Sequence, residues 1–316
     1  VTFPSGLMVD GLGSEARCMQ CHQGRESGVD VDDAIGETPD DSTEGGLRFL
    51  NVHYLPAGAT VYGAQAQGAY QFSGMTYNSK VTHVDSYDSC TECHDPHSTQ
   101  LKLDDCATCH TDVEDYEDLK DIRMARTNFD YDGDGDVSEG VHGEIETLGG
   151  ILYATMQAYA SDVVGTDLVY DSHAYPYFFV DTNGNGVSDA GEANYGNRYN
   201  AFTPRLLRAA YNYQFFRKDP GAYAHNSRYM IQVLYDTIAH LDEHESVTVT
   251  EMEDLVRAEQ DGHFDATAEA YRHWDEDGGV RSSCARCHSP EGFDFWAKYG
   301  INTPLDTAVS DGLTCE

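Results

Sequence analysis

The chain has 316 residues, with 19 Lys and Arg against 55 Asp and Glu, and a formal net charge of −36. This charge excludes a nucleic-acid-binding protein, because a phosphate backbone requires clustered Lys and Arg, and it argues against docking on anionic membranes. The 40% hydrophobic content, with 21 Tyr and 12 Phe, is sufficient for a folded protein, and no apolar run is long enough to predict a membrane span.

Eight of the nine cysteines fall in four copies of the pattern Cys-x-x-Cys-His. The four copies are Cys18, Cys21 and His22; Cys90, Cys93 and His94; Cys106, Cys109 and His110; and Cys284, Cys287 and His288. Two thiols at this spacing lie on one side of a helical turn and can form thioethers with one haem, whose iron the adjacent His then ligates. Zinc knuckles or disulfides are the alternatives, but neither explains the recurring His. The sequence predicts four haem c groups.

The ninth cysteine, Cys315, is followed by Glu316 at the end of the given sequence. These two residues would open a fifth copy of the motif if the polypeptide continued, and the alternative is a free or intermolecular thiol. Because every other Cys belongs to the motif, we expect the chain to continue.

The first predicted region, residues 1–125, holds three motifs. Residues 23–48 are rich in Gly, Asp, Glu and Ser and predict a loop, while the Tyr-bearing pieces 59–62 and 68–72 predict a small β-hairpin. The second and third motifs begin only 16 residues apart, at Cys90 and Cys106. We therefore expect their haems to lie close together, as rapid electron exchange requires.

Three further regions follow. Residues 126–198 form a calcium-loop and helix insertion, with apolar residues at helical spacing over 142–164. Residues 199–260 are predicted to be helical: Thr203 and Pro204 open one helix, Asp219-Pro-Gly ends it, and a second helix covers about 226–243. Thr250 and Glu253 form a capping box that predicts another helix. Residues 261–316 are the C-terminal haem region. The predicted fold is mainly α with extensive irregular loop, a small β-hairpin and calcium loops of EF type.

Two acidic loops match the twelve-residue EF-type calcium loop. The second of them is the better match, with oxygen-bearing side chains at Asp181, Asn183, Asn185, Asp189 and Glu192 and a glycine at Gly186. The first offers Asp130, Asp132, Asp134 and Asp136, but its twelfth residue is Val141. Glu139 or Glu144 must then replace it, and we prefer Glu144 at the start of the helix. The alternative for both loops is an acidic surface turn. Ca²⁺ is the predicted second cofactor.

Ten histidines remain after the four of the motifs, which favours two His ligands for each iron. His97 follows its motif too closely to reach the opposite face of the same iron, so it would ligate a neighbouring haem. The preferred distal ligands are His97, His83, His53 and His225. His240 and His244 are spaced four apart on one helix, but acidic neighbours favour a solvated helix end. A distal ligand from another copy of the chain remains open.

The motifs, together with Cys93-His94-Asp-Pro-His97, resemble those of multihaem c-type cytochromes of respiring microbes. The stretches 203–214 and 219–226 are also similar to a segment found in large members of this class. The resemblance implies bis-His haems, attachment outside the cytoplasm and little regular structure around the haems. Within the class, it points either to extracellular electron-conduit cytochromes, some of which polymerise into filaments, or to multihaem oxidoreductases.

The function we expect is that of an electron carrier rather than an enzyme, located outside the cell, at its surface or in the periplasm. Its partners would be other redox proteins or extracellular acceptors, with self-association into a filament as one form. The alternative is a multihaem oxidoreductase that acts on a nitrogen or sulfur compound at one haem with an open axial position. Four complete motifs and abundant His favour the carrier.

Overall fold

A computed structural model of the chain describes residues 1–80, 83, 87–123, 129–248 and 252–258. All of them belong to one compact unit, Val1–Ala258. The fourth motif, Cys315 and the histidines His263 and His273 lie outside the described residues. The division into four regions, which no observation on the described residues tests, stays a prediction.

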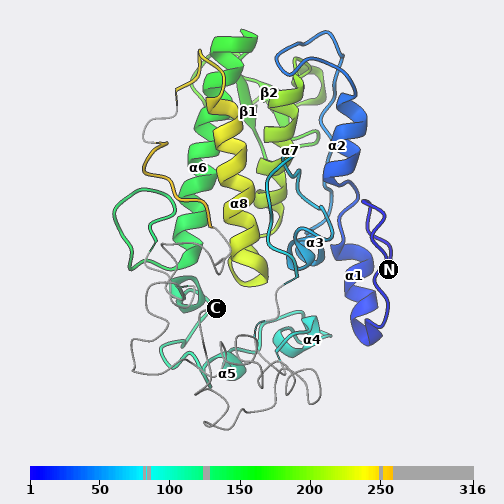
Figure 1. Cartoon of the computed structure of the whole chain (residues 1–316), viewed down its shortest axis with the longest axis vertical. Helices are drawn as coiled ribbons and strands as arrows, with labels where there is room; N and C mark the ends of the chain where they lie inside the picture. The colour runs from blue at the N-terminus through cyan, green and yellow to red at the C-terminus, as the bar shows by residue number, and fades with distance from the viewer. Residues whose placement is uncertain (81–82, 84–86, 124–128, 249–251, 259–316) are drawn as a thin grey trace, which may run out of the picture. The chain divides into compact units, whose positions relative to one another are not determined.

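The described part is mainly helical, as predicted, with one small sheet (Figure 1). Its α-helices are α1 (Ala16–His22), α2 (Gly28–Ile35), α3 (Ala57–Tyr62), α4 (Cys90–Cys93), α5 (Leu103–Cys106), α6 (Val141–Tyr159), α7 (Pro204–Lys218) and α8 (Ala222–Asp242). Short 3₁₀ turns lie at η1 (Gly13–Glu15), η2 (Asp118–Asp121) and η4 (Tyr195–Asn197), and a π-helical turn, η3 (Ala160–Val164), extends α6. Antiparallel strands β1 (Leu168–Tyr170) and β2 (Phe178–Val180) pair Val169 with Phe179. Within this described part, no helix is both long and apolar enough to cross a membrane.

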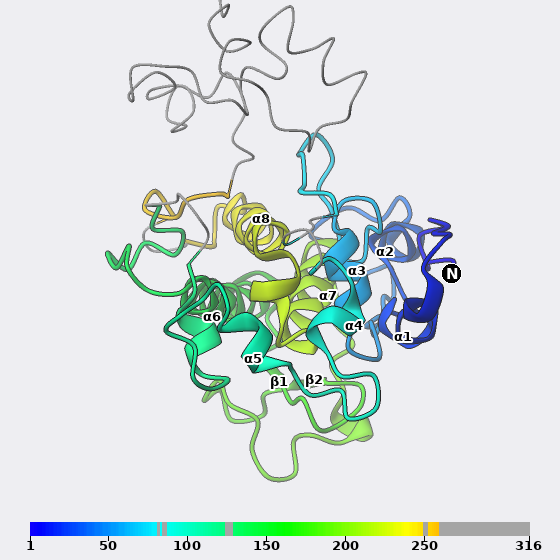
Figure 2. The same cartoon turned by 90° about the horizontal axis from the view of Figure 1, so that it is seen from below.

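Helices α6, α7 and α8 pack together and form the core, as both views show (Figure 1, Figure 2). Leu148 and Leu152 of α6, Phe215 of α7 and Leu234 of α8 are completely buried. The apolar residues that predict a helix over 142–164 supply the face of α6 in this core. That prediction is confirmed, since α6 and η3 together cover 141–164.

The start and end of α7 follow local sequence signals. The Thr203 hydroxyl accepts a hydrogen bond from the Leu206 backbone N–H (3.1 Å), and Pro204 is the first helical residue. The helix ends at Lys218, before Asp219-Pro-Gly, as predicted. Helix α8 then begins at Ala222 and is kinked at Asn226, whose φ of −168° is not helical. The Asn226 side chain accepts from the Tyr229 backbone N–H (3.2 Å) and so caps the longer part of α8, which confirms the second predicted helix.

The hairpin predicted from 59–62 and 68–72 is wrong. Residues Ala57–Tyr62 form α3 instead, with Ala59 and Thr60 completely buried and the helix packed on α8. The backbone that follows pairs with side chains of α7 and α8 rather than with a neighbouring strand. Asn212 both donates to and accepts from the backbone of Tyr70, at 3.1 and 2.7 Å.

Other buried polar side chains do the same, so that the N–H and C=O groups of this irregular backbone have hydrogen-bond partners without forming a sheet. Hydrogen bonds link Gln214 to Val52 N, Tyr211 to Gly68 O, Gln232 to Asn78 N and Asn226 to Ser79 O. The small sheet of the described residues is formed by β1 and β2, which follow α6. The helix predicted from Thr250 is also wrong over the described residues, because 252–254 form a turn and 255–258 have no regular secondary structure.

Candidate haem and cation sites

The first motif lies on α1. Met19 is buried and anchors the helix, while Cys18, Cys21 and His22 lie toward the surface on the same short element. The His22 Nδ1 is 2.8 Å from the Leu55 carbonyl oxygen. A carbonyl only accepts, so Nδ1 carries the proton and Nε2 is left free to ligate a metal.

The second motif begins with a capping box. The Ser89 backbone N–H donates to Glu92 (2.9 Å), and the Ser89 side chain caps the first turn of α4 in return. The His94 Nδ1 lies 3.1 Å from the Thr99 carbonyl oxygen, an arrangement equivalent to that of His22. The residues after His94 turn back on themselves, and Lys102 N donates to Cys93 O (2.9 Å). This turn leads directly into α5 and the third motif.

The three described motifs are neighbours in a row. The Glu15 carboxylate, next to the first motif, accepts from the backbone N–H of Cys90. Burial raises the pKa of the Cys90 thiol to about 12, with contributions from Glu15 and Cys18. Burial also raises the pKa of Cys93, and the charge of Cys106 in the third motif raises it further. The second motif thus lies within electrostatic range of the other two. None of the six described cysteines forms a disulfide bond.

Two motif histidines face a second imidazole. The ring centroids of His94 and His225 are 6.5 Å apart, with 43° between the ring planes. Those of His83 and His110 are 6.0 Å apart, with 46° between the planes. In each pair, one member belongs to a motif and the other is one of the predicted distal ligands. Neither pair is joined by a hydrogen bond between its rings among those found in the described part.

His225 sits where α8 begins and is held from two sides. Its Nδ1 is 2.9 and 3.0 Å from the two carboxylate oxygens of Asp219. One face of the ring lies against Gly221, where an added Cβ would be 2.7 Å from the His225 Cε1. Burial lowers the pKa of His225, but the Asp219 carboxylate outweighs it, so the pKa lies above its ordinary value.

The other predicted distal ligands are exposed. His53 has a positive φ of 76°, and its backbone N–H donates to Asn51 (2.9 Å). The His97 backbone N–H donates to Asp95 (3.0 Å). The structure brings neither ring against another described imidazole among its ring contacts. His240 contacts Phe72 and hydrogen-bonds Glu243 (3.2 Å), near the Arg205 guanidinium, so it belongs to the polar surface of the core.

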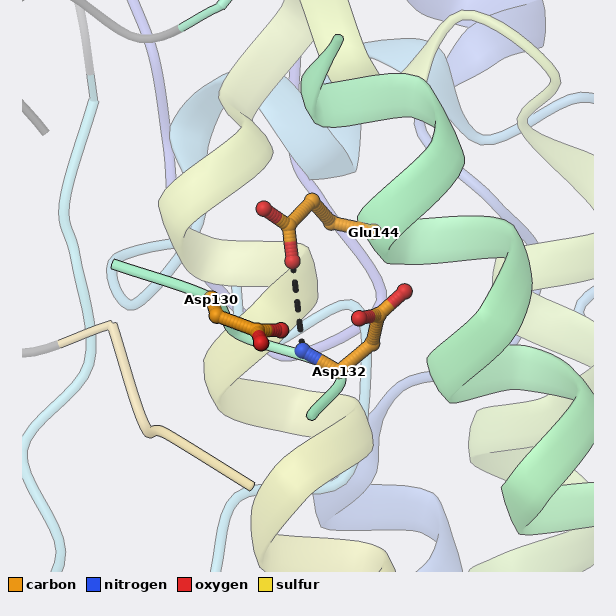
Figure 3. A group of neighbouring side chains, drawn as sticks. All are labelled: Asp130, Asp132 and Glu144. Carbon is orange, nitrogen blue, oxygen red and sulfur yellow. Dashed lines mark hydrogen bonds between the residues drawn. The ribbon is translucent and has the colours of Figure 1, made fainter. Parts of the chain in front are cut away.

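The first acidic loop brings carboxylates together against α6. Asp130, Asp132 and Glu144 face one another in Figure 3, and their oxygens lie within 4.8 Å of one another. Asp132 is 4% exposed and Glu144 is 0% exposed. Asp132, Asp134 and Glu139 make a second, overlapping group.

This loop concentrates negative charge around two buried carboxylates, those of Asp132 and Glu144. Burial raises the pKa of Glu139 to about 7, and the charges of Asp132, Glu144 and Asp134 add to the effect. Asp132 Oδ2 and Glu139 Oε1 are buried without a hydrogen-bond partner among the described residues. Arg123 forms an ion pair with Glu144 (2.7 Å). Buried carboxylate oxygens without donors fit a hard cation, because such a cation takes oxygen ligands.

The second loop repeats the backbone hydrogen bonds of the first, but the glutamate that closes it stands at a different distance in sequence from the start of the loop. Asp181 accepts from the backbone N–H of Gly186 (2.7 Å), just as Asp130 accepts from that of Gly135 (2.7 Å). Glu192 accepts from the N–H of the loop's second residue, Thr182 (2.8 Å).

In the first loop the N–H of the second residue, Tyr131, is bound by Glu144 at 2.7 Å. Glu144 therefore takes the place of the twelfth residue, although it stands three residues beyond Val141. In the second loop Asn183 and Asn185 each donate a side-chain N–H to Asp189, at 2.8 and 2.7 Å. Its polar groups are thus already satisfied within the loop. Asp136 of the first loop, which accepts from Ser138 N (2.8 Å), lies at its exposed end.

Sequence reasoning missed two carboxylates at these sites. In the sequence Asp219 indicates only a helix break, because its contact with His225 depends on how the chain turns between α7 and α8. No motif includes Glu15, whose contact with Cys90 spans 75 residues. No spacing pattern in the sequence predicts either contact.

Comparison with known proteins gives relatives over most of the chain. It is 26% identical over 248 residues to the C-type polyheme cytochrome OmcB of Geobacter sulfurreducens, and 26% identical over 242 residues to OmcC of the same organism. Each alignment covers 70% of this chain, which spans about 30% of the length of the curated relatives it matches. No family model matches, and no solved structure matches. The similarity confirms the class of protein that the Cys-x-x-Cys-His motifs predict.

Proposed function

We propose that this chain, a multihaem c-type cytochrome, carries electrons along a row of bis-His haems attached outside the cytoplasm. The observation that carries the proposal is the row of three motifs, two of which have a second imidazole facing the motif His. When bound, haem iron supplies a one-electron couple whose potential its ligands set.

The spacing of the histidine pairs supports axial ligation. A metal–imidazole bond is about 2 Å long, so two imidazoles on opposite sides of one iron have ring centroids about 6 Å apart. The 6.5 Å of His94 and His225 and the 6.0 Å of His83 and His110 agree with this value. We assign His225 to the haem of Cys90 and Cys93, and His83 to that of Cys106 and Cys109. His53 and His97 stay candidates for the remaining irons, including that of the motif at 284–288.

The chain's own contribution is to hold these ligands still. The carbonyls of Leu55 and Thr99 and the carboxylate of Asp219 each accept a hydrogen bond from an Nδ1–H and so direct the Nε2 of that ring toward the iron. Ligands fixed in this way before and after electron transfer keep the reorganisation small. The hydrogen bonds of Glu15 with Cys90 and of Lys102 with Cys93 would keep the bound groups close together.

The surroundings of the chain are part of the same proposal. Its partners are other redox proteins or acceptors outside the cell, and its net charge of −36 favours a cationic or cation-bridged partner. We further propose that copies of the chain assemble into a filament. Electron microscopy of native material at high concentration would show filaments, and a monodisperse monomer would contradict that form.

Ferric spectra of the purified protein test the carrier proposal. We expect every ferric haem to be low-spin and to bind no cyanide, and every haem of the reduced protein to bind no carbon monoxide, because both axial positions would be filled. His225→Ala and His83→Ala should each convert one haem to high-spin, while His173→Ala, an exposed imidazole on the segment between β1 and β2, should change nothing. A high-spin, ligand-binding haem in the unaltered protein would favour the oxidoreductase alternative.

Calcium is the second cofactor we propose, held by Asp130, Asp132, Asp134 and Glu144 in the first loop and by the second loop through Asp181, Asn183, Asn185, Asp189 and Glu192. Support comes from the buried, unpartnered carboxylate oxygens of the first loop and from the backbone scheme that both loops share. A cation there would neutralise repulsion that otherwise weakens the start of α6.

Melting curves with and without Ca²⁺ test this assignment. A ligand at 100 times its dissociation constant stabilises a fold by about 2.7 kcal/mol, so a chelator should lower the melting temperature by several degrees. Glu144→Gln should remove most of this shift and Glu192→Gln a smaller part, because the second loop satisfies its own polar groups. Glu146→Gln, an exposed neighbour on α6, is the matched control. No response to the chelator would sink the calcium proposal.

A further inference from the structure

Asp219 is a buried carboxylate on the segment that joins α7 to α8. It is 2% exposed, and both its oxygens lie within 3.0 Å of the His225 Nδ1. Its ion-pair partner among the described residues is His225. The Gly221 backbone N–H also donates to it, at 3.2 Å. Burying an ionised carboxylate costs free energy unless the carboxylate is paired with a cation and hydrogen-bonded.

The partners of the other anchored histidines differ in charge. His22 and His94 donate to the neutral carbonyls of Leu55 and Thr99, whereas His225 donates to an anion. On the ligation proposed above, one haem would be held by His94, whose partner is neutral, and by His225, whose partner is an anion. A carboxylate at Nδ1 makes the imidazole a stronger donor to the metal, and its negative charge favours the ferric state.

We propose that Asp219 is a positioning residue that aims the Nε2 of His225 at the iron and lowers the reduction potential of the haem held by Cys90 and Cys93. This inference rests on the proposed ligation by His225. Rotation of the imidazole is opposed by Gly221 against its face and by the two carboxylate oxygens at its edge. The neighbouring Asn226 fixes the kink from the other side through Asn78 (3.0 Å) and Ser79 (3.1 Å).

The consequence is an uneven potential along the row. The motif of Cys90 and Cys93 stands between the first and the third. Because one of its ligands has an anionic partner, its haem would be harder to reduce than that of the first motif, whose described anchor is the neutral Leu55 carbonyl. An electron would then reside on the haem of the first motif in preference to this one.

Potentiometric titration of the full-length holoprotein, followed by absorbance and electron paramagnetic resonance, tests this inference. Asp219→Asn keeps the shape and one acceptor oxygen but removes the charge. We expect the midpoint potential of one haem to rise, while the others stay in place and all haems remain low-spin. Asp219→Ala should raise the same potential and also give a high-spin fraction, because the ring is no longer aimed.

A matched control is Asp236→Asn, which removes another buried carboxylate of α8. Asp236 is paired with Arg257 (2.8 Å) and lies about 16 Å along the helix from His225. This variant should lower thermal stability but leave every potential unchanged. If Asp219→Asn also leaves every potential unchanged, the inference is overturned.

The spin state of His225→Ala separates the two possible failures. A new high-spin haem in this variant upholds the ligation, so that an unmoved potential in Asp219→Asn refutes the tuning role alone. A His225→Ala protein in which all haems remain low-spin refutes the ligation itself, and the inference fails with it.

Discussion

Two parts of the molecule are built on different principles. Helices α6, α7 and α8 bury residues such as Leu148, Phe215 and Leu234 completely. Residues 87–123, which carry the second and third motifs, bury only Val113 and Leu119 among their hydrophobic side chains, and neither α4 nor α5 has a buried residue. Isolated helices shorter than about 12 residues are marginal in water. On the proposed function, the haem groups held by its cysteines and histidines would stabilise this segment.

The largest expected effect comes from removing a haem from the segment that carries the second and third motifs. Replacing Cys90 and Cys93 by Ser should remove one haem per chain, which mass spectrometry measures. Backbone amides of α4 and α5 should then exchange with solvent without protection, because little apolar burial remains there. Amides of α6 and α8 should keep their protection.

The paired replacement Ser14→Ala and Ser73→Ala, at exposed positions of the same unit, is the control and should change neither the mass of bound haem nor the exchange pattern. Loss of protection in α6 and α8 of the Cys90 and Cys93 variant would show that the two parts are not independent.

The second effect lies in the core. Leu152→Ala removes a completely buried side chain of α6, and a substitution of this kind costs about 2–5 kcal/mol of unfolding free energy. The number of haems per chain and their low-spin spectra should not change. Denaturant unfolding followed by circular dichroism measures the loss. A changed haem spectrum at low denaturant would couple the core to the haem segment and contradict the comparison.

The sequence predicts the parts of the molecule that depend on local signals, and it does not predict those that depend on tertiary contacts. Apolar spacing predicts α6, and Thr203 with Pro204 predicts the start of α7, because both signals are local. The hairpin expected at 59–72 is wrong, since side chains more than 140 residues away, such as Asn212, take up the hydrogen bonds of that backbone. The Cys-x-x-Cys-His spacing predicts which residues attach haem. It gives no information on the contact between Asp219 and His225, which depends on the tertiary path.

The smallest effect concerns an ion pair at the edge of the core. Burial raises the pKa of Asp41, but hydrogen bonds from Arg205 (2.7 Å) and Tyr159 (2.8 Å) outweigh it and hold the pKa below its ordinary value. The resulting stabilisation is present above the ordinary carboxyl pKa of about 4 and is lost as the pH falls through the lower folded value.

Asp41→Asn should therefore cost on the order of 1 kcal/mol at neutral pH, discounted for a carboxylate that is 37% exposed. Melting temperatures of the variant and the parent should converge as the solution is acidified below about pH 4. Asp10→Asn, at an exposed carboxylate, should show no such convergence because it starts from no difference. A gap that stays constant with pH would rule out the ionic origin.

The amide side chains of α7 and α8 fix the number of residues in the chain between the first two motifs. Gln214, Asn212 and Gln232 engage the backbone at residues 52, 70 and 78 in fixed succession. An inserted or deleted residue between these points would move the backbone groups out of step with all later amides at once. The length of this stretch is thus set by two helices that carry no haem motif, whereas the exposed turn at 43–46 has no such register to keep.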